Sequence, residues 1–138
     1  MKPTDLPLVL RHLRKSIKSW RVPVVTKISL QQNPFMVLVS CLLSLRTRDE
    51  ITDAASRRLF VLASSPKKLL RLDAKQVEKA IYPVAFYRNK TLRLYEISRA
   101  LIDDNDDKVP DSLDQLLRLK GVGRKTANLT LVLGHNKP

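Results

Sequence analysis

Cysteine and glycine are scarce in this 138-residue sequence, which holds one cysteine and three glycines. A single cysteine cannot form a disulfide within the chain, and this favours a reducing compartment. Cys41 and the two histidines, His12 and His135, lack the spacing of metal ligands, so we predict no bound metal. Because Cys41 lies inside an apolar run, we interpret it as a core residue rather than a nucleophile.

Long hydrophobic runs are also missing. The strongest apolar stretch, residues 35–45, has eleven residues, whereas a membrane-spanning helix needs about 20. Residues 6–21 are basic and amphipathic, and we interpret residues 6–20 as a first helix of the domain rather than a transit peptide. We therefore expect an intracellular protein that does not enter a membrane.

Positive charge is abundant, with a formal net charge of +13 that favours a polyanionic partner. Residues 1–48 hold nine Lys and Arg against one acid, and residues 49–100 hold eleven against six. Residues 101–138 hold six of each. Since 43% of the residues are hydrophobic, the chain is long and apolar enough to fold around a core.

Two of the three glycines lie one residue apart in the segment 119–128, whose sequence is LKGVGRKTAN. Leucines before the glycines follow helical spacing, and Ser112 with Gln115 fits a capping box. A second apolar helical pattern follows the glycines and stops at Gly134. The pattern predicts a helix, a two-glycine hairpin and a second helix within residues 112–133.

A glycine hairpin at the start of a helix exposes backbone N–H groups that bind anions. We expect it to bind a phosphate. A nucleotide-hydrolase loop is excluded twice, since it needs glycine before the lysine and a preceding strand, whereas Arg124 precedes Lys125 and a helix feeds the hairpin. The candidate phosphate-binding residues are Lys120, Gly121, Val122, Gly123, Arg124 and Thr126.

Helices account for the rest of the chain. Asn33-Pro34 opens a buried helix, Asp49 begins another, and Ser65-Pro66 and Asp73 with Gln76 begin two more. The helix after Asp49 is expected to turn one set of residues inward: Ile51, Ala54, Ala55, Leu59 and Leu62. A further helix to about Ile102 precedes the acidic segment 103–107, which lacks the glycine and glutamate of a calcium loop. The expected fold is an all-α bundle or barrel of about seven helices.

At residues 119–128 the sequence resembles the helix-hairpin-helix DNA glycosylases, and within them the endonuclease III branch. The resemblance extends over nearly the whole chain and includes the Leu-Leu-Ser segment 42–44 and the segment 82–90. It implies that the turn after this segment enters DNA, with Ser44, Arg46 and Arg48 as candidate contacts. Lys120 replaces the usual proline, and Arg46 stands where relatives usually have the glutamine that fills the gap left by an extruded base.

The resemblance also implies a reaction. Lys125 aligns with the family's lysine nucleophile, so we expect a DNA glycosylase with apurinic/apyrimidinic lyase activity on damaged, oxidised pyrimidine bases in double-stranded DNA. The family's catalytic aspartate and its cysteine-bearing iron–sulfur segment have no counterpart here. We expect one helical domain, residues 1–138, apparently truncated at its C-terminus and without a cofactor.

Two other functions stay open at this stage. The chain could be a non-catalytic helix-hairpin-helix fragment that only binds DNA, as the lacking aspartate suggests. A basic scaffold for RNA or for a protein partner is the third alternative. The hairpin sequence favours the two DNA-binding functions over the third, and Lys125 favours the enzyme over the fragment.

Overall fold

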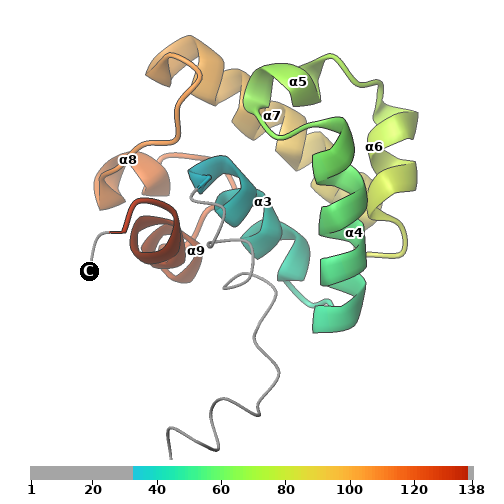
Figure 1. The fold of residues 1–138 in the computed structure, drawn as a ribbon. Coiled ribbons are helices and arrows are strands. Elements are labelled where there is room, and N and C mark those ends of the chain that lie inside the picture. The colour runs from blue at the N-terminus through green and yellow to red at the C-terminus, as the bar shows by residue number, and fades with distance from the viewer. Residues whose placement is uncertain (1–32, 137–138) are drawn as a thin grey trace, which may run out of the picture.

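The computed structural model describes residues 33–136, and the predicted helix 6–20 lies outside them. Within the described residues the fold is entirely helical, which confirms the all-α prediction (Figure 1). The elements are α3 (Pro34–Ser44), α4 (Asp49–Leu62), α5 (Pro66–Leu70), α6 (Ala74–Ile81), α7 (Tyr87–Asn105), α8 (Leu113–Leu117), α9 (Arg124–Leu129) and the π-helix η2 (Thr130–Gly134). No helix in this part of the chain is both long and apolar enough to cross a bilayer.

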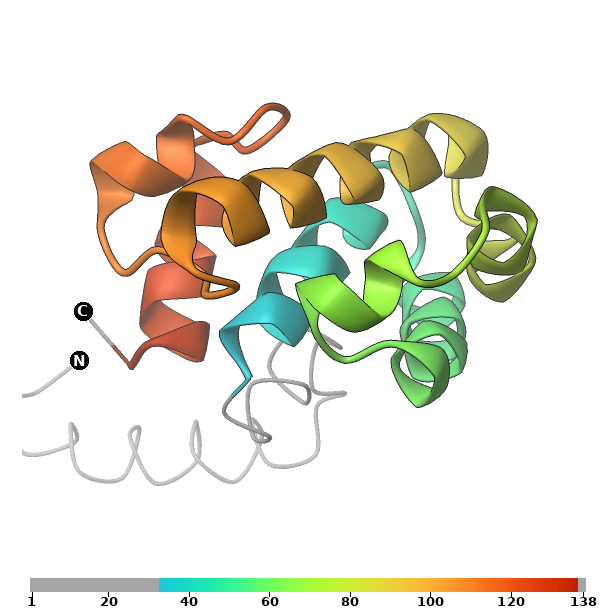
Figure 2. The same cartoon turned by 90° about the horizontal axis from the view of Figure 1, so that it is seen from above.

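Helix α3 lies at the centre, with α4, α5, α7 and α9 arranged around it (Figure 2). Its residues 35–43 are all buried, as the apolar run predicts. Asn33 caps the helix: its Oδ1 accepts from the N–H groups of Phe35 at 3.1 Å and Met36 at 3.3 Å. The amide Nδ2 of Asn33 also donates to the Ser64 carbonyl at 3.1 Å, which ties the start of α3 to the segment between α4 and α5.

We expect Asn33→Ala to lower the free energy of unfolding by about 2 kcal/mol, at the upper end of N-cap losses, because a bond to another segment is lost as well. Ser65→Ala is the matched control, since Ser65 Oγ only caps the short α5 through the Lys68 N–H. Urea unfolding of both variants tests this. An Asn33→Ala loss no larger than that of Ser65→Ala would contradict it.

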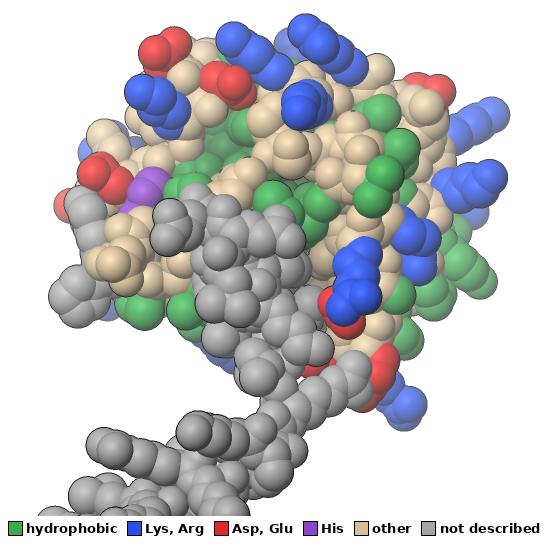
Figure 3. All heavy atoms as spheres, viewed as in Figure 1, with side chains coloured by type: hydrophobic (Ala, Val, Ile, Leu, Met, Phe, Trp, Pro, Cys, Tyr) green, Lys and Arg blue, Asp and Glu red, His purple; other side chains and the backbone are tan. Residues whose placement is uncertain are grey.

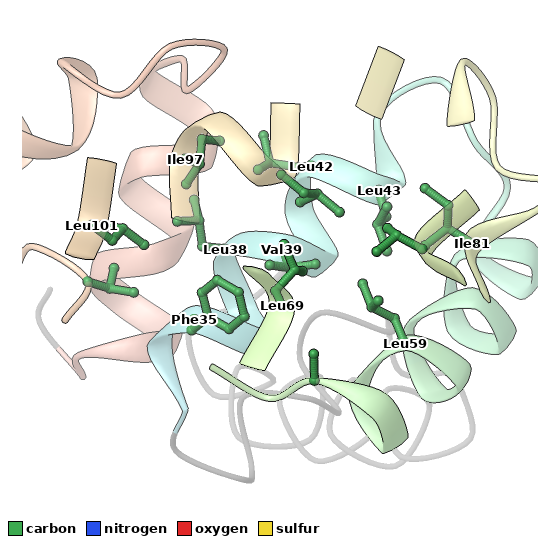
Figure 4. Close-up of a cluster of buried hydrophobic side chains, with 14 of the residues drawn as sticks. Phe35, Leu38, Val39, Leu42, Leu43, Leu59, Leu69, Ile81, Ile97 and Leu101 are labelled. Carbon is green, nitrogen blue, oxygen red and sulfur yellow. The ribbon is translucent and has the colours of Figure 1, made fainter. Parts of the chain in front are cut away.

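The core packs buried side chains of the surrounding helices against those of α3 (Figure 4). The largest fully buried side chains come from α3 to α8: Val37, Leu38, Val39, Leu43, Leu59, Leu69, Ile81, Leu94, Ile97, Leu101 and Leu116. Burying these aliphatic groups supplies the main driving force for packing the short helices.

The inward face of α4 agrees with the prediction at Ile51, Ala55 and Leu59 but not at Ala54 and Leu62. Ala54 and Leu62 are exposed, and the buried residues are Thr52, Ala55, Ser56 and Leu59. These positions follow the helical repeat, but three of the four side chains are small. Small side chains suit the close packing of α4 against both α3 and α6.

Helix α7 is longer than predicted and ends at Asn105 rather than near Ile102. Asp106 and Asp107 follow in left-handed backbone conformations, with φ of 53° and 62°. The N–H of Asp107 donates to the Leu101 carbonyl at 3.0 Å. Part of the acidic segment therefore forms the last turn of α7 and its cap.

The chain then returns through α8, the hairpin and α9 to the start of α3. Ser112 Oγ accepts from the Gln115 N–H at 3.3 Å, but the described residues lack the return bond of the predicted capping box. The second helix stops at Gly134 as predicted, although its last turn has π geometry. A Cβ on Gly134 would lie 2.9 Å from Pro34 Cα, so this close approach of η2 to α3 requires glycine.

Candidate nucleic-acid interface

The hairpin between α8 and α9 bends at Gly121, whose φ is +86°. A Cβ added there would lie 2.8 Å from Cδ and Nε of Arg93, a residue of α7. Gly121 is therefore favoured by its left-handed conformation, and the flexible Arg93 side chain would have to move to make room for a Cβ. At Gly123 an added Cβ would meet nothing within 4 Å.

Of the three hairpin amides predicted to bind phosphate, one is used in a hydrogen bond within the hairpin and two are not. The Val122 N–H donates to the Leu119 carbonyl at 3.1 Å, and the Val122 side chain is buried. Val122 is thus a correction to the prediction, because its amide is already used inside the hairpin. The N–H groups of Gly121 and Gly123 have no acceptor among the described residues and therefore stay candidate phosphate donors.

Lys125 is exposed in the first turn of α9, beside the exposed Arg124. Burial raises the pKa of the Cys41 thiol to about 12, and the nearby charge of Lys125 opposes this rise. The electrostatic contact places Lys125 near the C-terminal half of α3, and the high pKa agrees with Cys41 as a core thiol. The Thr126 side chain is buried, so only its backbone could contact a ligand.

The turn between α3 and α4 carries the other predicted residues. Ser44 Oγ donates to the Cys41 carbonyl at 2.7 Å and completes the end of α3. Arg46 is exposed and has a left-handed φ of 57°. Arg48 is exposed at the N-cap of α4, where its carbonyl accepts from the Thr52 N–H at 3.0 Å.

Next to this turn lies a group of aromatic residues that sequence reasoning did not identify as functional. The Arg46 guanidinium lies 5.9 Å from the ring centroid of Phe86, which is 58% exposed and has a φ of 56°. Tyr82 packs edge-on against Tyr87, and Arg88 lies 5.6 Å from the Tyr87 ring. Exposed aromatic rings beside arginines are typical of surfaces that stack nucleic-acid bases.

A signal for this group was present in the sequence. The chain has only seven Phe, Trp and Tyr residues, and three of them lie within residues 82–87 beside a basic residue. Aromatic residues interleaved with basic ones are typical of nucleic-acid binding.

Helix α7 places the turn and the hairpin side by side. Lys90 Nζ contacts the turn by donating to the carbonyls of Leu43 at 3.2 Å and Leu45 at 2.6 Å. Arg93, three residues further on, lies under Gly121. Because three helical residues rise only about 4.5 Å, the two parts of the interface are neighbours on α7. Figure 2 shows the hairpin lying next to α7.

Positive charge surrounds these elements. Glu96 lies 3.0 Å from Arg93 and 4.0 Å from Lys120, whose side chain is 74% exposed. Exposed pairs of this length contribute little, so both cations can still attract an anion. Lys and Arg side chains also stand out along the upper and right-hand edges of the face in Figure 3, where α4, α5 and α6 lie in Figure 1.

The hollows among the described residues lie away from Lys125. One of about 590 Å³ lies at the start of α3, where Asn33, Lys108 and His135 are among its lining residues. A groove of about 470 Å³ lies between α7 and α8, and residues from Glu96 to Lys120 line it. Lys125 is exposed and does not line this groove. In the described range, no three His, Cys, Asp or Glu side chains gather where they could hold a metal ion.

Comparison with known proteins agrees with this geometry. Residues 39–137 match the model of the HhH-GPD superfamily of base excision DNA repair proteins. Endonuclease III of Thermotoga maritima is 45% identical over 108 residues, which cover 78% of this chain and 51% of that protein. The chloroplastic Endonuclease III homolog 2 of Arabidopsis thaliana is 31% identical over 97% of this chain and 37% of its own length.

Solved structures agree as well. A non-covalent Endonuclease III–DNA complex superimposes with a TM-score of 0.77 and 26% identity, over 99% of this chain and 61% of the other. A trapped Endonuclease III–DNA covalent intermediate, described as an estranged-adenine complex, superimposes with a TM-score of 0.74 and 25% identity. The match covers 99% of this chain and 62% of the other. The chain spans about half the length of the first curated relatives it matches.

Proposed function

Because this chain belongs to the HhH-GPD superfamily of base excision DNA repair proteins, we propose that it binds double-stranded DNA at a damaged or abasic site and reacts there through Lys125. The observation that carries the proposal is the exposed Lys125 amine directly after a glycine hairpin that offers two unused backbone N–H groups. The proposed place of action is inside the cell, where DNA is found.

The hairpin's part is to hold the DNA backbone. The N–H groups of Gly121 and Gly123 would donate to a phosphate oxygen, with Lys120 and Arg124 supplying positive charge beside it. Such contacts fix the position of the strand without reading its sequence. Binding of this kind weakens steeply as salt rises, because each neutralised phosphate releases counterions.

Arg46 and Phe86 would act at the lesion itself. Chemistry on a sugar carbon within a duplex requires the nucleotide to be flipped out, which leaves a gap in the stack. The guanidinium of Arg46 and the ring of Phe86 are exposed, flat groups that can stack on neighbouring bases. We assign them to that gap.

The chemistry assigned to Lys125 is imine formation followed by elimination. A neutral amine adds to the sugar carbon C1′. At a damaged nucleotide the base leaves and the C1′–O4′ bond of the sugar ring then opens, whereas at an abasic site the open-chain aldehyde loses water. Either route gives an iminium, which acidifies the C2′ proton. Loss of this proton and cleavage of the C3′–O bond releases the 3′ phosphate oxygen, and water then frees Lys125. Oxidised pyrimidines are the proposed bases.

An iron–sulfur cluster does not fit these residues. Such clusters are held by four cysteine thiolates, and this sequence has one cysteine. The thiol of Cys41 is buried and has a pKa raised to about 12, so it is not a ready ligand. We therefore propose no cofactor-dependent step for this chain.

Borohydride trapping tests the proposal. The 138-residue chain is mixed with a duplex that carries one abasic site, and borohydride reduces any imine to a stable adduct. We expect an adduct with the abasic duplex, none with an intact duplex, and duplex binding that falls with salt. Salt-sensitive binding without an adduct would support a non-catalytic DNA-binding module, and the absence of both would overturn the proposal.

A further inference from the structure

The Thr47 side chain joins two segments that carry the interface. Its Oγ1 accepts from the Ala85 N–H at 3.1 Å and from Lys90 Nζ at 3.4 Å. The same hydroxyl donates to the Leu45 carbonyl at 3.3 Å. One donor and two acceptor positions are the full hydrogen-bonding capacity of a hydroxyl, so Thr47 Oγ1 is fully used. We call this set of hydrogen bonds, which joins the turn after α3 to the loop before α7, the node.

Lys90 completes the node from α7. Its three ammonium N–H groups have three acceptors, the carbonyls of Leu43 and Leu45 and the hydroxyl of Thr47. Helix α3 has no basic residue in its last turn, so Lys90 supplies the positive charge that its C-terminal carbonyls favour. Burial lowers the Lys90 pKa to about 8, which still leaves a mainly charged donor at neutral pH.

The node lies directly beside the two residues assigned to the DNA gap. Arg46 stands between Leu45 and Thr47, and Phe86 follows Ala85. Both have left-handed backbones, with φ of 57° and 56°. Residues with side chains adopt this conformation only where their surroundings enforce it. Hydrogen bonds on the adjoining residues provide that enforcement, and they bring the guanidinium to 5.9 Å from the ring centroid.

We propose that Thr47 and Lys90 are positioning residues that lock the turn after α3 to the loop before α7, so that Arg46 and Phe86 enter the DNA as one pre-formed unit. The inference rests on the proposed function of the interface. Neither positioning residue touches the reacting sugar in this scheme. Without the node, Arg46 and Phe86 would relax independently toward extended backbones, and the gap would be filled less well.

The node is separable from the folding core. Thr47 is only partly buried, whereas the helices that it joins are held by fully buried side chains such as Leu43, Leu59 and Ile97. Thr47→Val keeps the shape of the side chain but removes the hydroxyl, and Thr47→Ser restores the hydroxyl. Lys90→Met removes the ammonium, with Lys75→Met, an exposed lysine at the start of α6, as the matched control.

The test measures selectivity rather than affinity alone. Dissociation constants of the full chain are measured for an intact duplex and for one with a tetrahydrofuran abasic analogue, together with melting temperatures. We expect Thr47→Val and Lys90→Met to lower the preference for the abasic duplex about fivefold to tenfold, with intact-duplex binding changed by less than about twofold. Thr47→Ser and Lys75→Met should retain the preference.

A mutant cycle adds a second, independent measurement. If the node acts through Arg46 and Phe86, then adding Thr47→Val to a variant that carries both Arg46→Ala and Phe86→Ala should cause no further loss of selectivity. Additive losses would overturn the proposal, and so would loss of the helical circular dichroism in Thr47→Val, which would make the node part of folding.

Different results would contradict the proposed function and the proposed role of Thr47 and Lys90. A wild-type chain that does not distinguish the abasic duplex from the intact one would contradict the proposed function. A wild-type chain that distinguishes them, together with a Thr47→Val variant that does so equally well, would contradict only the role of the node.

Discussion

Replacing Lys125 by arginine should reduce the borohydride-trapped adduct at least about a hundredfold, because no other group substitutes for a covalent nucleophile. Arginine keeps the positive charge at the start of α9 but has no neutral amine to form an imine. Binding to an abasic duplex should therefore change by less than about threefold. Quantifying the adduct on a denaturing gel, next to the dissociation constant, separates the two effects.

Lys120→Ala is the control for that experiment. The Lys120 side chain is 74% exposed beside the hairpin. Its removal would take away one phosphate interaction, so duplex affinity and the salt dependence of binding should both decrease. At saturating protein the adduct should persist. An adduct that survived Lys125→Arg would have to form through another amine. That result would remove Lys125 from the reaction.

The second large effect is expected at the hairpin. Gly121→Ala should destabilise the fold by about 1–2 kcal/mol, the cost of a left-handed conformation for a residue with a Cβ. The new methyl group would also displace Arg93, which now lies 2.8 Å from its position. Since both changes distort the turn that presents the two free amides, duplex affinity should fall about tenfold.

Gly123→Ala is the matched control, because it alters the same hairpin without those conflicts. Gly123 has a negative φ of −93°, and an added Cβ meets nothing within 4 Å. Fluorescence anisotropy with a labelled duplex at two salt concentrations compares the variants. If the two substitutions weakened binding equally, or neither did, the phosphate-binding role of the hairpin backbone would be wrong.

Helix starts and the central helix were readable from the sequence. Asn33, Ser65 and Asp73 each accept a hydrogen bond from the first turn of the helix that follows. The apolar run 35–43 became the buried α3, and the two-glycine hairpin appeared between two helices. These features depend on side chains within about four residues of one another, which is the range over which capping and helical periodicity act.

Other features followed only from packing. The inward stripe of α4 was wrong at Ala54 and Leu62, because the surfaces of α3 and α6 select which side is covered. The Val122 amide was lost as a phosphate ligand, since the turn uses it for a bond to Leu119. Phe86 was overlooked because its contact with Arg46 joins two separate segments of the chain.

The sequence by itself determined that this chain is helical, that it carries a glycine hairpin, and that a lysine follows the hairpin. Tertiary structure decided which groups share the interface. The bonds from Ala85 to Thr47 and from Lys90 to Leu45 span 38 and 45 residues, and Arg93 reaches Gly121 from a different helix. Contacts of this kind form only when the core has fixed the helices relative to one another, so no local pattern encodes them.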